Sequence, residues 1–142
     1  MAFTADAGYI GVLRAATNYS SGTDQYTLVK ITSGTLCLQT AANTDVPIGV
    51  LMNKPTSGRE ALIAIRGIVP VRVESTAHAA ISVGNKLEPS SGAGGAVMPS
   101  TAGVNMYIIG RAMEALAANT TGVISMLITH QGAGSSGAAS AA

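Results

Sequence analysis

The chain has 142 residues, a formal net charge of +1 and only 11% charged residues, against roughly 25% in a typical soluble domain. Its length and its hydrophobic share of 47% suit one folded domain and exclude a wholly disordered chain. The balanced charge excludes a basic stripe for nucleic acid, and no apolar run reaches the roughly 18 residues that a membrane span needs.

Residues 1–25 predict an N-terminal arm. They are mixed in character and become polar toward a loop that contains Ser20, Gly22 and Asp24. The first residues carry neither a basic start nor an apolar stretch, so a secretory signal is not expected. Residues 9–14 favour a short strand only weakly, and we therefore expect the arm to need a partner before it becomes ordered.

Residues 26–130 predict an all-β domain, because short runs rich in Val, Ile, Thr and Tyr alternate with turn residues. Residues 26–31 and 36–39 flank a Thr-Ser-Gly-Thr turn and indicate a hairpin. Residues 46–52 indicate a strand that Pro47 restricts to a strand start or a sheet edge, since proline donates no ladder hydrogen bond.

Gly67 interrupts the next β pattern, so residues 61–66 and 68–74 predict two strands, broken or bent at that glycine. The second run alternates between two faces. One face consists of Val69, Val71 and Val73, and the other of Pro70, Arg72 and Glu74. Such alternation is typical of an antiparallel strand with one core face and one face toward water or a partner.

The last third of the chain predicts further short strands and two flexible segments. Residues 78–88 favour one helical turn that leads into a short strand, and residues 106–114 and 123–130 predict the final strand pair. Residues 89–95 contain only Pro, Ser, Gly and Ala, which predicts a flexible surface loop. Residues 131–142 are Gly, Ala and Ser after the first residue, the composition of a flexible tail.

Two segments of the chain resemble each other. Ile48-Gly49-Val50-Leu51-Met52 precedes a Thr-Ser-Gly turn and a strand, and Ile109-Gly110-Arg111-Ala112-Met113 precedes a Thr-Thr-Gly turn and a strand. Two similar hairpins would explain this resemblance. Chance would also explain it, because Ala, Gly, Ser and Thr fill nearly half of the positions.

No pattern of catalytic or ligand-binding residues emerges. Residues 132–137 spell G-x-G-x-x-G, but a dinucleotide site needs a helix after the motif to receive the phosphates, and only a short tail of small residues follows. His78 and His130 are the only histidines, and we expect them to be solvated or hydrogen-bonded; Cys37 is the only thiol. The acidic residues are scattered singly. We therefore expect no catalytic residues, no cofactor and no metal.

Several short glycine-centred segments follow one another in a characteristic order. They are Pro47-Ile48-Gly49-Val50, Gly67 with its alternating strand, residues 80–87, residues 109–115 and residues 123–128. In their order and spacing, these segments resemble the small capsid cement, or head decoration, proteins of tailed bacteriophages. The resemblance covers about residues 26–130.

This resemblance implies a small β-clip-like barrel of short antiparallel strands and a non-enzymatic protein without catalytic residues. It also implies a place in the virion, on the outer capsid surface, where a homotrimer braces neighbouring copies of the major capsid protein. The sparse charge agrees with this role, because few charged residues on a surface of roughly 6,700 Å² indicate a surface that partners cover.

We expect the contacts with the capsid and with sister subunits to come from the N-terminal arm and from the outward face of the alternating strand. The candidate residues are Phe3, Tyr9, Ile10, Arg14, Arg72 and Glu74. Three alternatives stay open. They are a small β-clip module that binds a sugar or another small ligand, another virion component such as a tail or spike protein, and an enzyme that uses Cys37 or the histidines.

Overall fold

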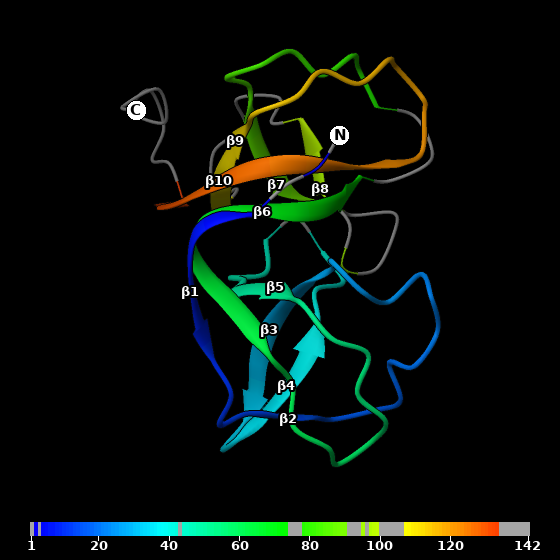
Figure 1. Cartoon of the computed structure of the whole chain (residues 1–142), viewed down its shortest axis with the longest axis vertical. Helices are drawn as coiled ribbons and strands as arrows, with labels where there is room; N and C mark the ends of the chain where they lie inside the picture. Colours follow the sequence, from blue (N-terminus) through cyan, green and yellow to red (C-terminus); the bar gives the residue numbers. More distant parts are fainter. Residues whose placement is uncertain are drawn as a thin grey trace.

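Ten strands make up the regular structure of the described residues (Figure 1). The computed structural model describes residues 2, 4–42, 44–73, 78–90, 95, 97–99 and 107–133. The strands are β1 (Ala5–Ile10), β2 (Arg14–Ala15), β3 (Leu28–Ser33), β4 (Leu36–Gln39), β5 (Gly49–Leu51), β6 (Ile63–Val73), β7 (Lys86–Pro89), β8 (Val97–Pro99), β9 (Tyr107–Ala112) and β10 (Gly122–Ala133). No helix occurs in this described part of the chain, and the predicted all-β class is confirmed.

The strands form one mixed sheet in the order β10-β9-β7-β8-β6-β5-β3-β4-β2, with β1 paired to β6 and a further pairing between β10 and β6. Most neighbours are antiparallel, whereas β2–β4 and β6–β8 are parallel. β8 meets β6 through the single residue pair Val73↔Val97. Among the described strands, the two ends of this path, β10 and β2, do not pair. The pairing of β10 with β6 joins β6, β8, β7, β9 and β10 in a ring, but the sheet as a whole is not closed into the barrel that the resemblance implied.

The long strand β6 connects the two halves of the molecule. Its C-terminal part pairs with β10, and its N-terminal part pairs with β5 on the same edge and with β1 on the opposite edge. At Gly67 the strand turns, as the green ribbon in Figure 1 shows, and the glycine has a φ of +92°. The prediction of a bend at Gly67 is confirmed, and the two predicted strands are one continuous strand.

In the described part of the chain, the buried apolar side chains other than Ile108 form two clusters. The large core cluster contains Leu28, Val50, Ala64, Val69, Val71, Val73, Ile81, Leu87, Val97, Ile109, Ala112, Ile124, Met126 and Ile128. The small core cluster contains Leu13, Ala15, Tyr19, Val29, Cys37, Leu51, Ala61 and Ile63. The three valines of the predicted core face of β6 are all buried, so the period-two pattern identified them correctly.

Two predictions about the chain between β6 and β8 are wrong in part, and residues 91–94 of the predicted flexible loop lie outside the described residues. Residues 78–85 contain no helical turn, because Ile81 pairs through its backbone with Leu116 at 2.8 and 3.0 Å. Gly95, at the end of the predicted flexible loop, is buried and anchored: its amide donates to the Thr40 carbonyl, and its own carbonyl accepts from the Leu28 amide. Backbone groups provide this anchor, so a segment without suitable side chains is still fixed at that point.

The two similar segments of the sequence belong to two hairpins, β5–β6 and β9–β10. In the first hairpin, a Cβ atom on Gly49 would overlap the Ala64 carbonyl of the next strand. In the second, a Cβ atom on Gly110 would overlap the Leu127 carbonyl. The glycine thus has the same physical role in both segments, which is to let two backbones approach closely.

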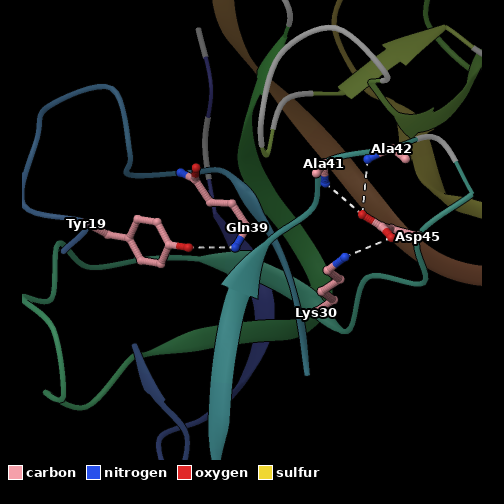
Figure 2. A network of polar contacts seen from close by, with 6 residues as sticks. All are labelled: Tyr19, Lys30, Gln39, Ala41, Ala42 and Asp45. Atoms are coloured by element: carbon pink, nitrogen blue, oxygen red, sulfur yellow. Dashed lines mark hydrogen bonds and ion pairs between the residues drawn. The ribbon is translucent and has the colours of Figure 1, made fainter. Parts of the chain in front are cut away.

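The loop between β4 and β5 is closed by one carboxylate (Figure 2). The carboxylate of Asp45 accepts hydrogen bonds from the Ala41 amide at 2.7 Å and the Ala42 amide at 3.1 Å, and it pairs with the Lys30 ammonium at 2.9 Å. Burial acts to raise the pKa of Asp45, but the amides and the ammonium outweigh it and lower this pKa below its ordinary value.

We predict that Gly67→Ala destabilises the protein far more than Gly84→Ala. Both glycines have a φ of +92°, but only at Gly67 would the new Cβ overlap the Asp6 carbonyl; the space beside Gly84 is open. The expected losses in the free energy of unfolding are about 3 kcal/mol at Gly67 and about 1 kcal/mol at Gly84. Urea unfolding of both variants measures the difference, and equal losses would contradict the role of Gly67.

We also predict that Asp45→Asn lowers the free energy of unfolding by about 1 kcal/mol at neutral pH, because the amide keeps one acceptor but loses the charge. The pKa of Asp45 is lower in the folded chain, so its stabilising effect is present above the unfolded pKa of about 4 and is lost as the pH falls through the folded pKa.

Urea unfolding at a series of pH values should therefore show wild type and Asp45→Asn converging in acid. The control Lys30→Gln removes the ion pair, leaves both amide hydrogen bonds and should lose less stability than Asp45→Asn. A loss for Asp45→Asn that does not change with pH would show that the charge of Asp45 contributes nothing.

Candidate interaction surface

The six candidate contact residues do not form one cluster. Phe3 and Glu74 lie outside the described residues. Tyr9 and Ile10 belong to β1, and Arg14 follows them in β2. Arg72 lies near the C-terminal end of β6. Tyr9 and Ile10 pair with the N-terminal end of β6, so a surface that also contains Arg72 would have to extend around the bend at Gly67.

Arg72 holds a loop of its own chain. Its guanidinium donates to the Gln25 carbonyl at 3.2 and 3.3 Å and to the Gly22 carbonyl at 3.1 Å. In addition, the backbone amide of Arg72 donates to the Tyr26 carbonyl at 2.8 Å. These bonds fix the chain before β3 against β6, so the outward face of β6 is occupied at this point by the protein itself.

A two-stranded ribbon, composed of residues 9–15 and 59–64, lies at the lower end of the molecule in Figure 1. Its residue pairs are Tyr9↔Ala64, Ile10↔Ile63 and Arg14↔Glu60. Between the last two pairs, the N-terminal strand has one residue more than its partner, which is a β-bulge. Ile10 and Leu13, on either side of the bulge, both pack against the small core cluster. The extra residue is therefore turned away from the core.

The outward face of this ribbon, called the ribbon face below, combines apolar and charged side chains. Its apolar members are Tyr9, Val12 and Leu62, which are 45%, 75% and 40% exposed. Arg14 and Glu60 are its charged members. The other large apolar side chains exposed in the described part of the chain, Ile31, Val46, Val83 and Leu127, lie singly on other elements. The ribbon face thus gathers apolar side chains that elsewhere are dispersed.

Positive charge borders the ribbon face. Arg14, Lys54 and Arg59 are exposed, and Glu60 is the acidic residue among them. Arg14 donates from Nη1 to the Gly58 carbonyl at 3.0 Å, which places its guanidinium against the loop that carries the two other cations. Apolar side chains beside arginine form a composition that is enriched at protein interfaces. Among these residues, Tyr9 and Arg14 are candidates from the sequence, whereas Val12 and Leu62 are not.

The histidines and the cysteine serve internal contacts. His78 is buried, with Nδ1 at 2.7 Å from the Ala79 carbonyl oxygen and Nε2 at 2.9 Å from that of Thr120. Nε2 of His130 lies 2.9 Å from the Ile65 carbonyl oxygen. Burial raises the pKa of the Cys37 thiol, which disfavours the thiolate that nucleophilic chemistry needs. The described residues contain no group of three or more His, Cys, Asp or Glu suited to a metal ion.

One edge of the sheet is closed by a side chain. The Tyr19 hydroxyl accepts a hydrogen bond from the Gln39 amide at 2.8 Å and so satisfies the outer edge of β4 beyond β2 (Figure 2). Burial is the main cause that raises the pKa of Tyr19. On the opposite side of the molecule, β1 pairs with β6 alone among the described strands. Within the described part of the chain, the outer edge of β1 is thus open.

Comparison with known proteins finds one matching family and a solved structure with a similar fold. The family model described as phage cement protein matches residues 16–128. Among solved structures, the head fiber gp8.5 N base of bacteriophage phi29 has a similar fold, with a TM-score of 0.58 and 18% sequence identity over 89% of this chain and 97% of that one. No match was found among curated protein sequences. No helix in the described residues is long and apolar enough to cross a membrane.

The family match covers most of the chain and includes the two similar hairpins and the bent strand β6. It bears out the resemblance inferred from the order of the glycine-centred segments. The chain belongs to the phage cement protein family.

Proposed function

We propose that this protein binds the outer surface of an assembled phage capsid as a homotrimer and stabilises the shell by bridging neighbouring copies of the major capsid protein. Membership in the phage cement protein family, over residues 16–128, is the observation that carries this proposal. The family is structural, and the chain is accordingly a capsid-associated structural protein.

The composition of the surface supports the proposal. With 11% charged residues, the protein has few groups that favour solvent over a protein partner. Three large apolar side chains gather on the ribbon face, where a contact would remove them from water. A capsid repeats the same contact site many times, so an oligomer that engages several sites binds with a high effective concentration even when each contact is weak.

The N-terminal segment contributes to the fold as well as to the proposed contact. Leu13, Ala15 and Tyr19 are buried in the small core cluster, and residues 5–10 form β1. A deletion of residues 2–20 would therefore remove part of the core, and loss of capsid binding in such a variant would say nothing about the contact itself. Single substitutions at exposed positions are the appropriate tools.

We predict that the protein co-sediments with capsids assembled in its absence, that binding is saturable, and that the bound protein raises the temperature at which these capsids disassemble. Bridging is the physical reason for the last effect, since each bound oligomer must be released before neighbouring subunits can separate. Light scattering should give three times the chain mass of 14.1 kDa for the free protein.

The control is an unrelated β-protein of the same size, which should remain in the supernatant. A protein that does not co-sediment at any concentration would overturn the proposed function. Binding without any change in disassembly temperature would overturn bridging, and a mass of one or two chains would overturn the trimer.

A further inference from the structure

The open edge of β1 is the first of three observations that lead beyond the proposed function. β1 makes its strand contacts with β6 only, among the described elements, and Figure 1 shows it at the margin of the molecule. The neighbouring strands have no such open edge. β2 lies between β4 and Glu60, and the Tyr19 hydroxyl caps the edge of β4 at Gln39. An open strand edge offers backbone donors and acceptors whose natural partner is another extended backbone.

The ribbon face provides side-chain contacts directly beside this edge. Tyr9 lies in β1 itself, and Val12 follows in the bulge, 75% exposed. Leu62 stands on the partner strand two residues from Ala64, which pairs with Tyr9. Leu62 and Tyr9 therefore project on the same side of the ribbon, since residues two apart on a strand share a face. A segment paired with β1 would find apolar side chains beside it.

The charges around the ribbon face decide what kind of chain can pair there. Three cations, Arg14, Lys54 and Arg59, stand against Glu60, so two copies of this face would repel each other in a symmetric contact. The other described acids do not form an acidic face on a sister copy. Glu88 is buried, Asp45 pairs with Lys30, and Asp24 and Glu114 accept hydrogen bonds from their own chain. Asp6 is exposed, but it is a single acid.

We propose that the outer edge of β1 and the ribbon face together receive an extended segment of the major capsid protein, which adds a strand to β1. The chemistry of the site defines this segment: an apolar side chain packs against Tyr9 and Val12, and an acidic side chain lies near Arg14 and Arg59. This inference rests on the proposed function, because it names the partner surface of the same capsid contact.

Two substitutions test the site, each with a matched control at the other end of the molecule. Val12→Asp places a charge where an apolar side chain of the segment would pack, and Val83→Asp places the same charge at a turn valine that is 64% exposed. Arg14→Glu reverses one cation, and Arg111→Glu reverses another; both arginines donate Nη1 to a glycine carbonyl in a neighbouring turn, Gly58 and Gly84. Capsids assembled without the protein are the probe, and affinity is measured by co-sedimentation.

We expect Val12→Asp and Arg14→Glu each to weaken capsid binding by about tenfold or more, as substitutions at the centre of an interface do. Val83→Asp and Arg111→Glu should bind like wild type. The thermal unfolding of Val12→Asp should match that of Val83→Asp, because both side chains are exposed and neither belongs to a core cluster. The Arg14→Glu effect should shrink as salt is raised, since the contact is electrostatic.

The outcomes separate this inference from the proposed function. If wild type binds and both ribbon variants bind equally well, the site is wrong and the proposed function stands. If wild type fails to bind capsids, the proposed function itself falls, and the site falls with it. If Val12→Asp instead changes the mass of the free oligomer while capsid binding per oligomer is retained, the ribbon is a contact between sister copies and the inference is overturned.

Discussion

The close approach of two backbones at Gly67 is the constraint on which the rest of this structure depends. β6 can turn there because a residue without a Cβ atom accepts a φ of +92° and leaves space for the Asp6 carbonyl of β1. Asp6 itself has a φ of +52°, so the two strands deviate from regular geometry at the same place. The bend in one strand is thus matched by an irregular register in the other.

From this bend follows the division of the molecule into two halves. Beyond the turn, β6 pairs with β10 and contributes valines to the large core cluster; before it, the strand pairs with β5 and contributes Ile63 to the small core cluster. At the corner, His130 covers the Ile65 carbonyl through Nε2, where β10 has left β6 and β5 has not yet begun to pair. The ribbon is anchored because the strand that carries it continues directly into the large core cluster.

Local features of the sequence predicted the local parts of this fold. The hairpin β3–β4 followed from its turn residues, and the core face of β6 followed from the alternation of Val69, Val71 and Val73. The bend at Gly67 was predicted for the same reason, since glycine in a β run marks a bulge or a close approach. Each of these features depends on residues that are near one another in the sequence.

The parts that could not be predicted depend on partners far apart in the sequence. Nothing in residues 5–10 indicates that they pair with β6, and Val12 is extruded only because its strand is one residue longer than residues 60–63 opposite. Gly95 is anchored by backbone groups of Leu28 and Thr40. Every residue type has these groups, so the composition of the segment cannot predict the anchor. For the candidate site, the sequence therefore offered Tyr9 and Arg14 as candidates but gave no sign of the bulge that exposes Val12.

The ribbon face is small for a surface that must hold this protein on a capsid by a single contact. A stable one-to-one complex buries roughly 800 Å² on each partner, and three partly exposed apolar side chains with one added strand fall short of an interface dominated by a large apolar core. Such a contact exposes only a few apolar side chains of the free protein to water. In the proposed function, affinity for the shell therefore comes from the number of contacts made at once. An oligomer that makes the same small contact with several subunits at once gains effective concentration with each one, and it discriminates an assembled shell from single subunits for the same reason.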